Sequence, residues 1–320
     1  MNTGIINRTV QLLSVAMLMT IVGCSLMNNI IESVNALEDM KVVDNLEPSE
    51  QYYLGRGVSA VIVDKYKPVE INDSTSENQI LYLNEMAGFI EVSSKNVTRS
   101  AIRLGDYTDR SYDEQQRVYE LALFKGVQVG ILDTDEISAF ATPGGFLWIS
   151  RGMINLCNNE DELAAIVAHE AAHIILDHGM ANYRTAHKNA VITSSLSETW
   201  FSGSGVGSNF GRLCVTLSEQ LFTGYNPGQE FEADNWGTRA LTASGYSPEA
   251  MLKMLQRIES YQKENDVDPD EYLAHHPPIG ERIQAVKDLI KAENLKGNSG
   301  TMSSEAVKAR QQRFNQAFKG

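Results

Sequence analysis

Apolar residues recur every three to four positions over two N-terminal stretches, 49–65 and 77–94, and this spacing predicts a helix in each. The same periodicity predicts further helices at 160–178, 180–199, 215–223, 229–244, 247–263 and 278–292. Helices should therefore make up most of the fold.

Between residues 124 and 151 the pattern changes to short runs of β-branched and aromatic residues. The runs GVQVGILD, SAFATP and GFLWISRG predict three strands, with Pro143, Gly144 and Gly145 between the second and the third. The fold class is therefore α+β, mainly helical with a small β-sheet. The strand that follows the turn can present an unpaired edge to an extended polypeptide, or it can lie in a buried hairpin.

The N-terminus reads as an export signal. Residues 1–23 contain one charged side chain, Arg8, and an apolar run too short for a membrane span, which takes about 20 apolar residues. The stretch IVGC resembles a bacterial lipoprotein processing box, so Cys24 is expected to carry a lipid anchor, with an ordinary secretory signal as the alternative. Ser25 after it resembles sorting to the outer membrane, which places the protein in the periplasm.

The remaining chain divides into three parts. Residues 24–48 are mixed and polar and predict a tether, which leaves a folded domain over 49–295. Within it, the glycine-rich stretch 202–211 lacks the preceding strand and the third glycine of a dinucleotide site and predicts a flexible loop. The tail 296–320 fits a basic amphipathic helix or a frayed end, and a solvated appendage is favoured.

Charge and cysteine content exclude some partners and leave one question open. Acidic residues outnumber basic ones, 41 to 27, which argues against a nucleic-acid surface because phosphate binding needs clustered cations. If Cys24 carries lipid, Cys157 and Cys214 remain. They fit one disulfide or two separate buried thiols equally well, because spacing alone does not show whether they come within bridging distance.

The stretch VAHEAAHIILDHG carries the strongest chemical motif. Residues four apart lie on one face of a helix, so His169 and His173 can point both imidazoles at one metal ion. Glu170 lies about 100° further around the helix axis, where its carboxylate can reach a water on the metal without becoming a ligand. His178 is five residues from His173 and is expected to turn away from this face, exposed to solvent, as is His187.

The best candidate for a third ligand lies in GQEFEADNWG, where Glu230 and Asp234 share one face of a second helix. Glu230 could complete the ligand set, and Asp234 could accept a hydrogen bond from the second nitrogen of a ligand histidine. Glu232 is expected to point elsewhere. Taken alone, the stretch also fits an acidic, solvated helix face.

Four motifs in order, AFATPGGFLWISRGMI, ELAAIVAHEAAHIILDHG, QEFEADNWG and HHPPIGERI, resemble the HtpX- and BepA-like zinc metallopeptidases, relatives of the CAAX prenyl endopeptidases. The resemblance runs from about residue 50 to 292 and fits a soluble, periplasmic branch. It implies a zincin-type domain with one Zn²⁺ per chain at His169, His173 and Glu230. It further implies catalysis by Glu170 and a supporting role for Asp234 beside the ligands.

The resemblance also places the HHPPIGERI loop near the cleft. His276 could then donate to the oxyanion or occupy the open position of the zinc ion, or it could belong to a polar loop that caps the next helix. His275 is the weaker candidate of the two. Arg282 is expected to be a structural salt-bridge partner.

The function that follows is a zinc-dependent endopeptidase with polypeptide substrates, acting on misfolded or misassembled cell-envelope proteins and held at the membrane by its lipid anchor. The alternative is a non-catalytic or latent zinc-binding chaperone or assembly factor of the outer membrane. Glu170 favours catalysis, because a pure binding module does not need an acid beside the ligand pair. Prenyl-protein processing fits poorly, since no membrane helices are predicted to accept a lipidated substrate.

Overall fold

The structure is a computed structural model that describes residues 46, 48–97, 126–182, 184, 206–265, 278–297 and 304–319. Apart from residues 46 and 184, these belong to one compact unit, Glu47–Asn182 and Gly205–Gly320. Several predicted features lie outside the described residues: the export signal, Cys24, most of the tether, His187, His275 and His276. None of the described helices has the length and apolar character needed to cross a membrane.

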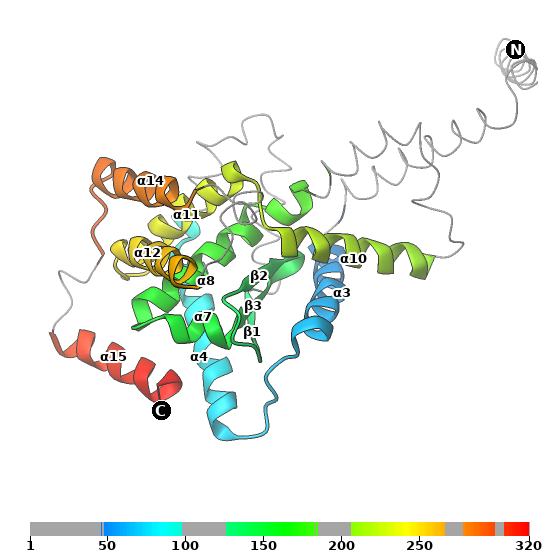
Figure 1. The fold of residues 1–320 in the computed structure, drawn as a ribbon, viewed down its shortest axis with the longest axis horizontal. Coiled ribbons are helices and arrows are strands. Elements are labelled where there is room, and N and C mark those ends of the chain that lie inside the picture. The colour runs from blue at the N-terminus through cyan, green and yellow to red at the C-terminus, as the bar shows by residue number, and fades with distance from the viewer. Residues whose placement is uncertain are drawn as a thin grey trace, which may run out of the picture. The chain divides into compact units, whose positions relative to one another are not determined.

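Helices dominate the described part of the chain, as the apolar spacing predicts (Figure 1). The predicted helices at 49–65, 77–94, 229–244, 247–263 and 278–292 are confirmed, with ends shifted by up to three residues. The helices are α3 (Pro48–Tyr66), α4 (Ser74–Ser93), α7 (Arg151–Leu156), α8 (Glu160–Ile175), α10 (Val206–Thr223), α11 (Pro227–Ala243), α12 (Glu249–Glu264), α14 (Ile279–Ala292) and α15 (Ser304–Phe318). Of these, α7 is an additional short helix in a stretch where the strand pattern ends.

The three predicted strands form one small sheet in the order β1-β3-β2, so the α+β fold class is confirmed. The strands are β1 (Gln128–Leu132), β2 (Ala139–Thr142) and β3 (Phe146–Ser150), with the 3-10 turn η1 (Pro143–Gly145) before β3. Strand β3 pairs parallel to β1 and antiparallel to β2. It is therefore the central strand, and the expectation that the strand after the glycine turn offers an unpaired edge is wrong.

The two outer edges of the sheet differ. Along β1, the Asn84 side chain donates to the carbonyl of Val129 and accepts from its N–H, at 2.8 and 2.9 Å. The Val69 N–H donates to Ile131 O at 2.8 Å. The edge of β1 is thus occupied by other parts of the chain, which leaves β2 as the edge to consider for an added strand.

Alternation along the strands divides the sheet into two faces. Val129, Ile131, Leu147 and Ile149 are buried in the hydrophobic core that they form with α4, α8, α11 and α12. Trp148 points to the opposite face, where its indole N–H donates to Ser59 of α3 at 3.0 Å. The sheet therefore lies between α3 on one side and the core helices on the other (Figure 1).

Local sequence fixes where the two central helices begin. Asn159 caps α8 by accepting from the Glu162 N–H, and acidic residues fill its first turn, where they interact favourably with the helix dipole. Helix α11 begins with a capping box between Asn226 and Gln229, with Pro227 at the first position. The two helices pack closely at Gly237, where an added Cβ would lie 3.3 Å from the carbonyl carbon of Ala168.

Two predicted boundaries are wrong. The predicted helix 160–178 ends at Ile175, because Leu176 and Asp177 form a turn and Asp177 takes the left-handed backbone conformation with φ 59°. A new helical stretch covers residues 178–182. The glycine-rich stretch predicted to be a loop is helical from residue 206 onward, as the first part of α10.

The C-terminal tail is not a solvated appendage over its described part. Helix α15 buries Phe314 completely in the core, and the Phe318 ring lies edge-on to Tyr82 of α4 at 5.3 Å. Arg310 pairs with Asp161 at 2.9 Å, at the first turn of α8. The segment is mostly polar, but its few apolar side chains lie on one face of the helix, and this face is enough to pack it against the rest of the domain.

Cys157 and Cys214 are both buried and free, so the two-thiol alternative holds and the disulfide does not. The Cys157 sulfur lies against Met254 at 3.8 Å, and burial raises the pKa of its thiol to about 12. Neither position requires a catalytic role.

Candidate metal centre

Helices α8 and α11 bring three predicted metal ligands together. His169 and His173 lie one turn apart on α8, and Glu230 faces them from the first turn of α11. The Nε2 atoms of the two histidines are 3.1 Å apart. His169 Nε2 lies 3.6 Å from Oε2 of Glu230, and His173 Nε2 lies 3.6 Å from its other oxygen, Oε1. One donor atom from each residue falls within 4.8 Å of the others.

This donor set fits a zinc ion. Atoms bound at about 2.0–2.1 Å around a tetrahedral ion are about 3.4 Å apart, and the three observed separations lie on both sides of that value. Two imidazoles and one carboxylate fill three positions and leave the fourth for water or substrate. His173 and Glu230 are buried and His169 nearly so, which keeps competing solvent away from the donors.

Asp234 lies behind His169, as the i, i+4 spacing on α11 predicts. Its Oδ1 is 2.9 Å from His169 Nδ1, at ion-pair distance although the ring N–H is not well aligned with it. Burial alone would lower the pKa of His169, but the carboxylates of Asp234 and Glu230 reverse this and raise it. Asp234 therefore faces the ring nitrogen that points away from the candidate ligand cluster.

Arg282 of α14 joins the two carboxylates of α11. It donates to both oxygens of Asp234 at 2.7 and 2.8 Å, and its Nη1 lies 2.6 Å from Glu230 Oε2. Burial would raise the pKa of Asp234, but the guanidinium and His169 lower it to about 2. The sequence-based expectation of a salt-bridge partner is confirmed for Arg282, and the salt bridge lies inside the site.

Glu170 is 9% exposed and lies next to His169 on α8. Burial raises the pKa of its carboxyl group to about 7; the charge on Glu230 acts in the same direction, and His169 and Arg282 oppose it. A carboxyl group that gains and loses a proton near neutral pH is suited to acid–base chemistry.

This raised pKa makes the stability of the metal-free protein depend on pH. The unfolded chain ionises Glu170 near pH 4.5, whereas the folded chain holds the proton until about pH 7. The protonated Glu170 therefore contributes fully to the free energy of unfolding below pH 4.5, and this contribution is lost as the pH rises through 7. The Glu170→Gln variant keeps a neutral side chain, so at pH 8 it should be more stable than wild type by on the order of 3 kcal/mol.

Urea denaturation of both chelated proteins at pH 4.5 and pH 8 tests this expectation. The extra stability of Glu170→Gln over wild type should appear at pH 8 and shrink at pH 4.5. The control variant Glu219→Gln, at an exposed position of α10, should show no such pH dependence. An equal stability difference at the two pH values would mean that Glu170 ionises normally in the folded state.

His178 is not exposed, contrary to the sequence-based expectation. Because the chain turns at residues 176–177, the His178 side chain lies against α8, and its Nδ1 is 2.8 Å from Nδ1 of His173. Its Nε2 lies 3.0 Å from an oxygen of Glu232, which was expected to point elsewhere. The sequence analysis misplaced His178 because it assumed an unbroken helix through position 178. Glu232 lies outside the candidate ligand cluster, as expected, and only its contact with His178 was not foreseen.

Tyr225, in the connection between α10 and α11, is a site residue that the sequence analysis missed. Its ring stacks on the His173 imidazole with centroids 3.8 Å apart, and its hydroxyl donates to Ala141 O of β2 at 3.2 Å. The tyrosine thus connects the edge strand with a candidate ligand. No spacing rule singles out a tyrosine in a connecting segment.

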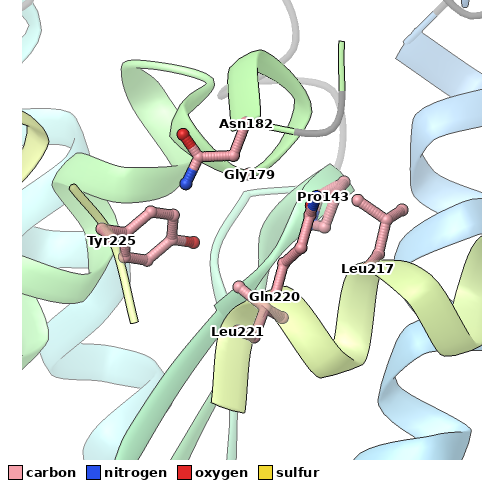
Figure 2. A pocket seen from close by; sticks show the side chains of 7 residues that line it. All are labelled: Pro143, Gly179, Asn182, Leu217, Gln220, Leu221 and Tyr225. Atoms are coloured by element: carbon pink, nitrogen blue, oxygen red, sulfur yellow. The ribbon is translucent and has the colours of Figure 1, made fainter. Parts of the chain in front are cut away.

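Tyr225 also borders a hollow beside the ligand cluster. Figure 2 shows Tyr225 and Asn182 on one side of it and Pro143 and Leu217 on the other. The remaining lining residues are Gly179, Gln220 and Leu221. A second hollow shares Pro143 and Tyr225 and reaches His173 and Ala141. The edge strand β2, the candidate metal ligands and an apolar recess therefore lie next to one another.

Comparisons with known proteins identify the family of the chain. The model of peptidase family M48 matches residues 111–290, more than half of the chain. The chain is 27% identical over 184 residues to the Beta-barrel assembly-enhancing protease of Yersinia pestis, covering 56% of this chain and 37% of that protein. It is 24% identical over 159 residues to Metalloprotease YcaL of Escherichia coli, covering 49% and 59%.

A eukaryotic relative is the Mitochondrial metalloendopeptidase OMA1 of Saccharomyces cerevisiae, 27% identical over 165 residues, covering 49% of this chain and 44% of that protein. The chain spans about a third of the length of the Beta-barrel assembly-enhancing proteases that it matches. The stretch of this chain that matches the family model includes His169, His173 and Glu230. The chain therefore belongs to peptidase family M48, a family of metallopeptidases.

Proposed function

We propose that this chain is a zinc-dependent endopeptidase in which His169, His173 and Glu230 bind one zinc ion and Glu170 moves the proton. The observation that carries the proposal is the convergence of three donor atoms from two helices within 4.8 Å. A buried carboxyl group with a pKa of about 7 lies directly beside them. A closed structural zinc site would have four protein ligands, whereas three ligands beside an acid are typical of hydrolases.

Bound zinc would supply Lewis-acid chemistry, making water acidic and polarising the peptide carbonyl. Glu170 accepts a proton as the water oxygen bonds to the carbonyl carbon, and it delivers the proton to the nitrogen as the C–N bond breaks. A single group can do both when its pKa lies near neutral pH, and burial raises the pKa of Glu170 to about 7. Asp234 holds the His169 ring from the far side and so orients a ligand.

The outer edge of β2 is the surface along which we propose that substrate binds. The Ser150 N–H donates to Ser138 O, and the antiparallel ladder then pairs Phe140 and Thr142 inward with β3. Ala139 and Ala141 consequently turn their peptide groups outward, and Ala141 O accepts from Tyr225. An extended polypeptide added here would lie beside α8 and its histidines.

Replacing Ala139 with proline should weaken substrate binding without disturbing the sheet. Proline removes an outward N–H at the first residue of an edge strand, where it is tolerated. Losing one main-chain hydrogen bond to substrate should raise KM for casein about 3- to 10-fold with zinc content unchanged. The matched variant Ala139→Val keeps the N–H and should retain KM, and equal KM values for the two variants would argue against strand addition at β2.

The proposed substrates are misfolded or misassembled cell-envelope proteins, with Cys24 as the lipid anchor and the periplasmic face of the outer membrane as the location. Support comes from the predicted export signal with its IVGC stretch and from relatives named for β-barrel assembly. A main-chain mode of recognition fits such substrates, because it tolerates varied side chains. The role of His276 near the oxyanion stays a prediction, since it lies outside the described residues.

Metal analysis combined with casein cleavage by the full-length protein tests the function. About one zinc per chain, cleavage lost on chelation and cleavage restored by zinc are the expected results. Zinc binding without cleavage of casein or unfolded outer-membrane protein would favour the non-catalytic chaperone or a latent enzyme. A chain without stoichiometric zinc would remove the basis of the proposal.

A further inference from the structure

A row of three side chains leads from the candidate metal centre toward the surface. His173 faces His178 through their Nδ1 atoms at 2.8 Å, and His178 faces Glu232 through its Nε2 at 3.0 Å. The side chain of His178 is 2% exposed and that of Glu232 is 32% exposed. The proposed mechanism assigns no role to His178 or Glu232.

The backbone holds this row in place from both ends. The turn at Asp177 presents His178 to the end of α8, and the carbonyl of His178 accepts from the Gln229 side chain at 3.3 Å. Gln229 belongs to the capping box that begins α11, and Glu232 follows on the same helix. The relative position of the two histidines is therefore tied to the helix that carries Glu230.

With both histidines neutral, the atoms in the row allow one consistent set of protons. A neutral imidazole has one N–H donor and one acceptor nitrogen. His173 directs Nε2 at the other ligands, so that atom needs its lone pair and the proton must lie on Nδ1. Its partner, Nδ1 of His178, must then accept, which places the proton of His178 on Nε2, facing the Glu232 carboxylate.

The opposite arrangement is unfavourable at both ends. If His178 donated from Nδ1, its Nε2 lone pair would face a carboxylate oxygen 3.0 Å away, acceptor against acceptor. The proton of His173 would then lie on Nε2 and block it as a ligand. The negative charge of Glu232 therefore selects the arrangement in which His173 can bind a metal.

We propose that His178 and Glu232 are positioning residues for the metal ligand His173, which set its tautomer and hold its ring. The proposal rests on the proposed zinc site and goes beyond it by assigning a function to a third histidine, His178, and a third α11 carboxylate, Glu232. Groups that act on a ligand in this way typically change metal affinity by about 10- to 100-fold. A histidine that only fills space would not.

Zinc affinity of the full-length protein, measured by competition with a chromophoric chelator, tests the proposal. The His178→Leu variant removes the acceptor and should bind zinc 10- to 100-fold more weakly. The conservative His178→Asn variant offers an amide oxygen near the position of Nδ1 and should recover affinity to within about threefold of wild type. The proposal would be overturned if His178→Leu kept wild-type zinc affinity, or if His178→Asn bound zinc as weakly as His178→Leu.

Glu232→Ala provides the second variant, because its partly exposed side chain can be removed without opening the core. It should weaken zinc binding several-fold, and the exposed Glu219→Ala is the matched carboxylate control. Wild-type affinity in Glu232→Ala contradicts the role of the carboxylate even if the leucine variant fails to fold. Failure of wild type to bind zinc would instead refute the proposed function, so the two failures are distinguishable.

Discussion

Glu170→Gln is expected to lower kcat for casein cleavage about 10²- to 10⁴-fold, the range typical of losing a positioned general base. Glutamine keeps the size and hydrogen-bonding atoms of the side chain but cannot take up the proton of the attacking water. Because Glu170 lies outside the three-residue ligand cluster, zinc content should remain about one per chain. Steady-state kinetics and metal analysis on the same preparation measure both quantities.

The control is Glu219→Gln, an exposed glutamate of α10, which should keep both activity and zinc. Residual activity within tenfold of wild type in Glu170→Gln would mean that another group accepts the proton. Loss of zinc together with activity would point to a structural role for Glu170. A wild type that binds zinc but is as inactive as the variant would favour the latent enzyme or the binding factor.

Arg282→Met is expected to destabilise the metal-free fold by about 3–5 kcal/mol at pH 7, because it leaves buried carboxylates without their guanidinium partner. Arg282 is 6% exposed, and it contacts Asp234 through two hydrogen bonds and Glu230 through an ion pair. Methionine fills similar space without charge, so the measured change reports the ion network. Urea denaturation after chelation gives the free energy of unfolding.

The pH dependence of the same variant has a defined sign. The pKa of Asp234 is lowered from 3.8 to about 2, so its stabilising ionisation is fully present above pH 3.8 and is lost as the pH falls through 2. The difference between wild type and Arg282→Met should therefore shrink in acid. It should not shrink on going from pH 7 to pH 8.

A matched control is Arg239→Met, which breaks the bidentate pair with Glu293 at the surface. The two side chains are 35% and 39% exposed, so the loss should stay below about 1 kcal/mol. A cost for Arg282→Met no larger than this would show that Glu230 and Asp234 are stable without their cation. The network would then be dispensable for folding.

Local sequence patterns predicted the helices and strands better than they predicted the contacts between them. Apolar spacing identified α3, α4, α11, α12 and α14, and three β-rich runs identified the strands. Strand order was out of reach, because pairing of β3 with both neighbours depends on contacts between segments and leaves no mark in the run itself. Docking of α15 was missed for a similar reason, since one buried Phe314 outweighs a mostly polar helix.

The candidate site divides in the same way. Pairs four residues apart on one helix, His169 with His173 and Glu230 with Asp234, could be read from the chain because helical geometry puts them on one face. Their joining into one cluster required α8 and α11 to pack, and the contacts of His178 and Tyr225 required a turn and a connecting segment that no periodicity describes.

By itself, the sequence determined the helical character of the chain, the face of α8 that carries His169 and His173, and the acidic face of α11, because these depend on backbone geometry within one element. Only the tertiary structure decided which acid meets which histidine, which strand is central in the sheet and where Arg282 lies. Those outcomes depend on the packing of distant segments, where small differences in helix ends and turns, such as the left-handed residue Asp177, redirect whole side chains.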